Sequence, residues 1–196
     1  MDQGLPEEER LRADFYALLA NLLSGPPDQA NLDQIAALSG DQSELGQGIT
    51  ALAKLAKITT PEAAEREYNA LFIGLGRGEL LPYGSYYLTG FLNEKPLAQL
   101  RAHMDKFGIE RSDDVKEPED HIATLAEIMA ALITGQHGVR LSLADQDAFF
   151  NTHLAVWAPH FFTDLEGAEG SLFYAPVGKI GRAFMEIEIE AFRMQS

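Results

Sequence analysis

Asp120 and His121 are adjacent residues whose types could carry out acid–base chemistry. They end the segment Glu117-Pro118-Glu119-Asp120-His121, in which three carboxylates stand beside one imidazole. A carboxylate and a histidine near a bound substrate can act as general acid and base in a small hydrolase. The sequence shows no G-x-S-x-G, H-E-x-x-H or Walker A pattern to supply a nucleophile, a metal or a phosphate-binding loop. A hydrolase or nucleotide-binding enzyme using Asp120 and His121 therefore stays an alternative, and we expect the protein not to be an enzyme.

The same segment also has a structural interpretation. Pro118 disfavours helix for the residue before it, so the next helix begins just after the proline. Asp120 is placed to cap that helix, and His121 falls at the edge of its apolar stripe. An imidazole in the first turn meets the positive end of the helix dipole, which favours its neutral form. On spacing alone, a capped helix start with one buried imidazole is the simpler interpretation.

The remaining polar motifs do not indicate a cofactor or a metal. Gly74-x-Gly76-x-Gly78 follows a predicted helix, whereas a dinucleotide-binding loop follows a strand. The chain has no cysteine, which excludes disulfides and thiolate sites. Its five histidines lack the spacing of a helical metal site. We therefore expect neither a cofactor nor a metal.

Aromatic residues gather at two places where a peptide could bind. One group comes directly after a glycine-rich loop and comprises Tyr83, Tyr86, Tyr87 and Phe91. Trp157 lies at the end of a predicted helix. Most aromatic side chains belong to the core, but aromatics beside glycine-rich loops can also line a peptide groove. Both interpretations stay open at this point.

The elements that must position these residues are predicted to be helices. Apolar residues recur at the three-and-four spacing of a helix face, and no segment alternates as a strand would. The predicted helices cover residues 11–23, 45–58, 60–72, 86–92, 96–107, 121–134, 142–157 and 169–194, the last with a bend near Pro176 and Gly178. A structured loop is expected over 74–84, and the charged connector at 110–119 is the candidate hinge. The predicted fold class is all-α.

Composition and charge limit the class of partner. The chain has 196 residues, 46% of them hydrophobic, which suffices for one substantial domain or two lobes sharing a core. A net charge of −15 repels nucleic acid and anionic membranes and attracts a cationic peptide. The acidic start, MDQGLPEEER, is unlike a secretory signal, and no apolar run approaches the ~20 residues of a membrane span. We expect a soluble, cytoplasmic protein that neither binds nucleic acid nor spans a membrane.

Several segments, taken in order, resemble the TorD-like (TorD/DmsD-type) redox-enzyme maturation chaperones. EYNALF at residues 67–72 and LPYGSYYL at 81–88 are similar to the E-Y-x-x-L-F…P-Y-x-S-x-Y-L stretch of that family. EPEDHI at 117–122 matches the family's E-P-x-D-H-I signature without departure. WAPHF at 157–161 and FY at 173–174 resemble its C-terminal W-x-x-x-F…F-Y pattern. The resemblance extends over essentially the whole chain.

This resemblance implies a particular fold and two possible oligomeric states. It implies a single helical domain of two lobes joined by a hinge. The lobes expected are residues 1–109 and 122–196, with the hinge at 110–121. It also implies either a monomer or a domain-swapped dimer.

The resemblance further implies a function. Such a chaperone binds the twin-arginine signal peptide, and often the mature part, of a molybdopterin oxidoreductase precursor, and delays export until the cofactor is inserted. Position 84 is glycine where relatives often carry a larger residue, which leaves no side-chain role there. A helical adaptor without peptide recognition is the other alternative. The client-binding residues implied are Tyr83, Ser85, Tyr87, Glu117, Pro118, Asp120, His121 and Trp157.

Overall fold

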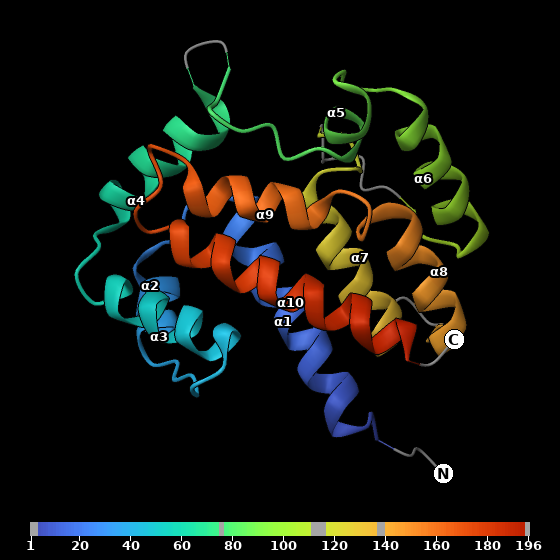
Figure 1. The fold of residues 1–196 in the computed structure, drawn as a ribbon, viewed down its shortest axis with the longest axis horizontal. Coiled ribbons are helices and arrows are strands. Elements are labelled where there is room, and N and C mark those ends of the chain that lie inside the picture. Colours follow the sequence, from blue (N-terminus) through green and yellow to red (C-terminus); the bar gives the residue numbers. More distant parts are fainter. Residues whose placement is uncertain (1–3, 75–76, 111–116, 137–139, 195–196) are drawn as a thin grey trace. The chain divides into compact units, whose positions relative to one another are not determined.

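All regular elements of the computed structural model, which describes residues 4–74, 77–110, 117–136 and 140–194, are helices (Figure 1). Within those residues no strand forms, and Tyr83 and His121 make an isolated extended bridge. The prediction of an all-α fold is confirmed. The elements are α1 (Glu7–Ser24), α2 (Gln29–Ala36), α3 (Glu44–Ala56), α4 (Pro61–Tyr68), the π-helix η1 (Asn69–Ile73), α5 (Gly84–Thr89), α6 (Lys95–Lys106), α7 (Ile122–Thr134), α8 (Leu143–His153), α9 (Ala158–Gly167) and α10 (Ala175–Arg193).

The chain divides into two compact units, each made of two separate stretches. Unit 1 comprises Met1–Ser24 and Tyr83–Trp157, and therefore contains α1 and α5 to α8. Unit 2 comprises Gly25–Pro82 and Ala158–Ser196, and contains α2 to α4, η1, α9 and α10. Each unit thus combines an early and a late part of the chain.

The lobes expected from the sequence differ from these units. The expected lobes were the continuous stretches 1–109 and 122–196, whereas both observed units are discontinuous. The expected hinge at 110–121 includes residues 111–116, which lie outside the described residues. The lobe boundaries and the hinge therefore stay a prediction.

Unit 1 is built around α7, which packs against α1. Glu127 is the only charged residue of α7, and nearly all its other residues are apolar. A helix that is apolar on all sides suits a position covered by several neighbours. Leu125 and Met129 of α7, and Tyr16 and Leu19 of α1, are almost completely buried. Helix α8 packs against α7 and α6, and α6 packs against α5.

Unit 2 is built on α10, which lies beside α9 and also packs against α3 (Figure 1). Two glycines permit these close approaches. A Cβ on Gly181 would lie 2.2 Å from ring carbons of Phe162 on α9. A Cβ on Gly48 of α3 would lie 2.8 Å from the side chain of Ile180. Larger residues at either glycine would push the helices of unit 2 apart.

Two carboxylates hold the loop that precedes α10. Glu67 of α4 accepts hydrogen bonds of 2.7–3.0 Å from three consecutive backbone N–H groups, those of residues 172–174. Glu79 accepts hydrogen bonds from the N–H groups of Glu169 and Gly170, at 2.7 and 3.1 Å. Glu67 therefore satisfies the amide of Tyr174, the N-cap residue of α10, and both carboxylates satisfy amides of the loop before it.

Prolines explain where the structure corrects the predicted helix boundaries. The helix predicted over 142–157 ends as α8 at His153, and α9 then begins with Pro159 in its first turn. The last helix begins at Ala175, so Pro176 marks its start rather than a bend within it. Proline fits the first turn because its missing N–H would have no partner in the helix there.

Candidate functional site

Asp120 joins the segment after Pro118 to the start of α5. Its backbone carbonyl accepts a hydrogen bond of 2.9 Å from the N–H of Gly84. Its Oδ2 accepts one of 2.7 Å from the N–H of Ser85. The prediction that Asp120 caps the helix starting at His121 is therefore wrong, because its carboxylate satisfies an amide of α5 instead.

His121 is the residue that caps α7. Its ring Nδ1 accepts a hydrogen bond of 3.2 Å from the N–H of Ala123, so this nitrogen carries no proton. Burial lowers the pKa of His121, although the nearby carboxylates of Glu117 and Asp120 oppose the shift. The neutral imidazole expected from the helix dipole is thus favoured mainly by burial.

Tyr83 and Glu117 both contact His121. The hydroxyl of Tyr83 donates a hydrogen bond of 3.2 Å to Glu117 Oε2, which lies 3.7 Å from His121 Nε2. The Tyr83 ring stands edge-on to the imidazole, with 5.1 Å between ring centroids. Pro118 closes the turn by accepting the N–H of His121 at 3.2 Å. Because the Glu117 side chain is 54% exposed, its carboxylate is accessible to a cationic partner.

Glu119, which precedes Asp120 in the sequence, forms an ion pair within the protein. Arg101 of α6 donates to both of its carboxylate oxygens, with Nε at 3.1 Å from each and Nη2 at 2.8 Å from Oε2. These hydrogen bonds hold the pKa of Arg101 above its ordinary value. Glu119 is 6% exposed, so this bidentate pair anchors the segment to α6.

A cavity of about 60 Å³ within unit 1 is lined in part by Asp120. The Asp120 Oδ1 atom is buried and accepts no hydrogen bond from any residue that the structure describes. A buried carboxylate oxygen without a donor costs free energy in the unliganded protein. Asp120 is thus an acceptor available to a donor that enters the cavity. The lining residues are Gly84, Leu88, Pro96, Gln99, Leu100, Asp120, Leu125, Thr152, His153 and Trp157.

Trp157 forms a wall of this cavity. Its indole N–H donates a hydrogen bond of 2.6 Å to the carbonyl of His153, and its side chain is almost completely buried. The ring of Tyr87 lies 5.4 Å from it, centroid to centroid. A Cβ on Gly84 would lie 3.0 Å from the indole nitrogen, so glycine at this position lets α5 approach Trp157.

An exposed apolar surface begins at the same cavity. Leu88, which lines the cavity, is 43% exposed, and Phe91 and Leu92 beyond the end of α5 are 69% and 40% exposed. Gly90, with φ at +82°, ends α5 in the left-handed conformation, so Leu88 lies in the last turn of α5 and Phe91 and Leu92 follow the helix end. Phe91 was expected only as part of an aromatic cluster, and Leu88 and Leu92 were not among the predicted site residues. Apolar residues on both sides of a helix-ending glycine were the sequence signal that could have indicated this surface.

His153 also contacts a second histidine. Its Nε2 lies 2.8 Å from Nδ1 of His103, and the two rings meet edge to face. Burial and then the neighbouring His103 lower the pKa of His153 from 6.5 to about 4. No group of three or more histidine, aspartate and glutamate side chains arranged to hold a metal occurs among the described residues.

The structure thus places all eight predicted site residues in unit 1. Six of them share direct contacts: Tyr83, Ser85, Glu117, Pro118, Asp120 and His121. Trp157 lines the same cavity as Asp120, and Tyr87 packs against Trp157. The arrangement combines one accessible carboxylate, one buried acceptor and an exposed apolar surface.

All regular elements of the described residues are helices, and comparison with known proteins assigns the chain to a family. The sequence profile of the nitrate reductase delta subunit family matches residues 39–163, more than half of the chain. The chain therefore belongs to this family.

Named relatives and a solved structure agree with this assignment. The chain is 29% identical to the chaperone protein TorD of Vibrio atlanticus, over 91% of this chain and 93% of that protein. It is 28% identical to the chaperone protein TorD of Aliivibrio salmonicida, with the same coverage. Its fold matches an Archaeoglobus fulgidus crystal structure, assigned as a redox enzyme maturation protein, with TM-score 0.58 and 26% identity over 89% of this chain and 93% of that one. These findings confirm the resemblance to TorD-like chaperones, a family that is not catalytic.

Across the described ranges, from residue 4 to residue 194 with their gaps, no helix is both long and apolar enough to cross a bilayer.

Proposed function

We propose that this protein is a cytoplasmic chaperone for the precursor of a molybdopterin oxidoreductase. It binds the twin-arginine signal peptide of that precursor, the apo form of its mature part, or both, and so delays export until the cofactor is inserted. The observation that carries this proposal is the buried Asp120 Oδ1, which lacks a donor among the described residues and lies beside an exposed apolar surface. Membership in a family whose named relatives are chaperones supports it.

The chemistry of the site fits a peptide that carries arginine next to an apolar stretch. A guanidinium has five N–H donors. These donors suit the buried Asp120 Oδ1, which has no donor among the described residues, and the exposed carboxylate of Glu117. The apolar stretch would then cover Leu88, Phe91 and Leu92, which are otherwise exposed to water. Burying apolar surface stabilises such a complex more than an exposed ion pair does, since exposed pairs are typically worth only ~0–1 kcal/mol.

The size of the cavity argues against the enzyme and nucleotide alternatives. Sites for small molecules usually enclose ~300–1,000 Å³, several times the volume beside Asp120. A cavity of about 60 Å³ accepts the head of one side chain rather than a nucleotide. His121, whose imidazole caps α7, is used by the fold and is poorly placed as a catalytic base.

Calorimetric titration of a synthetic twin-arginine signal peptide into the intact chain tests the proposal. We expect saturable binding, modestly weakened when both arginines are replaced by alanine. Removing the apolar stretch is expected to weaken binding severely. A peptide of the same composition in scrambled order is the control. Absence of binding to any twin-arginine peptide at low salt would refute signal recognition, and absence of binding to the apo enzyme as well would refute the chaperone function.

A further inference from the structure

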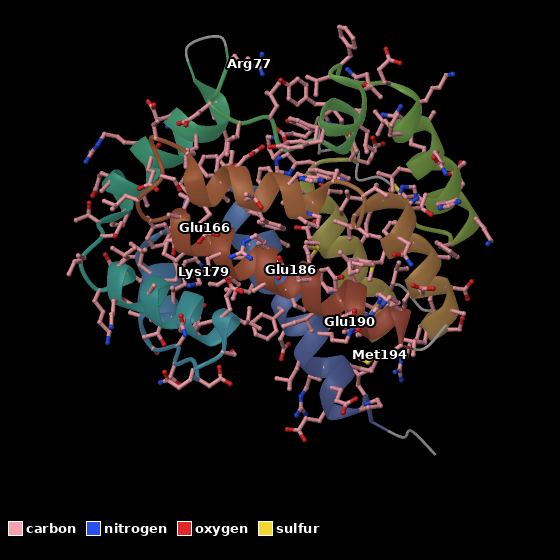
Figure 2. All side chains as sticks on the ribbon, in the orientation of Figure 1. Arg77, Glu166, Lys179, Glu186, Glu190 and Met194 are labelled. Atoms are coloured by element: carbon pink, nitrogen blue, oxygen red, sulfur yellow. The ribbon has the colours of Figure 1, made fainter. Side chains whose placement is uncertain are left out.

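Helix α10 carries an open apolar groove in unit 2, separate from the site in unit 1. The groove has a volume of about 410 Å³ and runs between the start of α3 and the C-terminal half of α10. Figure 2 labels Glu186, Glu190 and Met194, which follow one another along that half of α10. The lining residues are Ser43, Glu44, Leu45, Ala183, Glu186, Ile187, Glu190, Ala191 and Met194.

The apolar floor of the groove has the pattern of a helix-packing face. Ala183, Ile187, Ala191 and Met194 are spaced by four, four and three residues, so they form one stripe along α10. Ile187 is 50% exposed and Met194 is 73% exposed. The stripe spans about 16 Å, or roughly three helical turns. The two alanines leave room for another helix to approach closely.

The edges of the groove are acidic. Glu44, Glu186 and Glu190 line it, and no lysine or arginine is among its described lining residues. Arg182 pairs with three carboxylates at once, those of Glu44, Glu166 and Glu186. Arg182 and its three carboxylates carry a net charge of −2, and the positive charge of Lys179, which also acts on Glu44, reduces the local excess to one negative charge. Hydrogen bonding to Arg182 also lowers the pKa of Glu44, which keeps this carboxylate ionised at neutral pH.

Glu190 adds a further carboxylate that a partner can reach. It pairs with Arg193 at 2.8 Å, and both side chains are more than half exposed. Such exposed pairs contribute little and exchange readily with a new partner. The apolar stripe therefore lies between carboxylates that favour a cation over an anion.

We propose that this groove binds a basic amphipathic helix of a partner protein, one with an apolar stripe flanked by lysine or arginine. A helix fits because the floor is a three-turn helical stripe, and strand addition would need a sheet edge, which the described part of the chain lacks. A second copy of this chain fits poorly, because its net charge of −15 repels the acidic edges. The groove lies within unit 2, so the proposal does not depend on the site in unit 1.

The test uses a designed peptide and the full chain. The probe is a peptide of about 16 residues that forms a helix with leucine on one stripe, lysine on both flanks and alanine elsewhere. The control peptide carries glutamate in place of every lysine. Binding is measured by fluorescence anisotropy of the labelled peptide at low salt. We expect the lysine peptide to bind and the glutamate peptide not to bind.

Matched variants locate the binding. Ile187→Asp places a charge in the stripe and is expected to weaken binding of the lysine peptide by roughly tenfold or more. Ile58→Asp is the control, because Ile58 is 78% exposed in the same unit and lies outside the groove. Glu190→Lys is expected to weaken binding of the lysine peptide and to strengthen binding of the glutamate peptide. Glu65→Lys, at an exposed position of α4, is expected to change the binding of neither peptide. Circular dichroism checks that each variant stays folded.

Each other outcome overturns the proposal. Undetectable binding of the lysine peptide, or binding that Ile187→Asp leaves unchanged, shows that the groove is not the site. Equal binding of the lysine and glutamate peptides removes the assigned charge preference. If the unmodified chain sediments as a dimer that Ile187→Asp dissociates, the groove is occupied by a second copy instead.

Discussion

The two side chain oxygens of Asp120 have different environments. Oδ2 accepts the N–H of Ser85 and so helps to hold the start of α5, whereas Oδ1 is buried without a donor from the described residues. The first oxygen stabilises the fold, and the second costs stability until a ligand donates to it. A single carboxylate therefore links the local structure of the segment to the proposed recognition of a cationic group.

The substitution Asp120→Asn separates these two effects. The amide oxygen of asparagine can still accept the N–H of Ser85, so the free energy of unfolding is expected to stay the same or to rise slightly. Loss of the charge is expected to weaken twin-arginine peptide binding roughly tenfold, as for a charge-assisted hydrogen bond. Urea unfolding and calorimetric titration measure the two quantities. Asp105→Asn, on the exposed side of α6, is the matched control, and a variant that loses stability without losing affinity would assign Asp120 a purely structural role.

The histidine pair predicts a dependence of stability on pH. The pKa of His153 falls from 6.5 to about 4 on folding, so the unfolded chain takes up its proton first as the solution is acidified. The stability contributed by neutral His153 is complete above about pH 6.5 and is lost progressively toward pH 4. His153→Gln is expected to flatten this part of the urea-unfolding profile, and exposed His160→Gln is not. Parallel profiles for the parent chain and His153→Gln would contradict the prediction.

The carboxylate of Glu67 connects two segments that are far apart in the sequence. The EYNALF segment supplies Glu67 and Tyr68, and the FY segment supplies two of the backbone N–H groups that donate hydrogen bonds to Glu67. The rings of Tyr68 and Phe72 lie 5.9 and 5.6 Å from that of Tyr174. These residues belong to the core of unit 2 and fix where α10 begins, so their role is structural.

Glu67→Gln is expected to destabilise unit 2 by about 2 kcal/mol, because a charged acceptor of three N–H bonds becomes a neutral one with a single oxygen. Glu65→Gln, exposed on the same helix, is expected to cost less than about 0.5 kcal/mol. Guanidinium unfolding of both variants measures the difference. Equal stabilities would show that the loop before α10 is held by its buried aromatics rather than by the carboxylate.

Long helices with regular apolar spacing could be predicted from the sequence, and short ones could not. The apolar stripe predicted for the helix after Asp120 appears as α7. Thr60 and Ser142, the first residues of two predicted helices, cap α4 and α8. Helix α2 was missed because its eight residues span little more than two turns, too few for periodicity to show. The cap at Asp28, whose side chain and that of Asn31 bond each other's backbone, was its signal.

The sequence predicted which residues of the candidate site lie together, but not which hydrogen bonds and ion pairs they make. The residues named around Asp120 and His121 do lie together, because adjacent positions in a turn stay adjacent in space. Which helix Asp120 caps depends on an amide 35 positions away, in Ser85, which spacing within one segment does not reveal. The pairing of Glu119 with Arg101 is equally non-local.

The whole molecule carries a net charge of −15, which acts on the rate of encounter with a basic peptide. At physiological ionic strength charges are screened over ~8 Å, so long-range attraction is strong only at low salt. Raising the salt is expected to lower the association rate constant of a twin-arginine peptide on the order of tenfold, with little change in the dissociation rate. Stopped-flow fluorescence over a series of salt concentrations checks this. A dissociation rate that carried most of the salt effect would place the charges inside the bound interface instead.

The division into two discontinuous units also sets an order for folding during synthesis. Unit 1 has all its residues once Trp157 has left the ribosome, whereas unit 2 begins at Gly25 and lacks α9 and α10 until later. Helix α3 is therefore made long before α10, the helix against which it packs. Domains generally fold as their residues emerge, at ~5–20 residues per second. A nascent chain stalled when Trp157 has just left the ribosome thus exposes a complete unit 1 and an incomplete unit 2, whose apolar faces remain open to proteases until translation resumes.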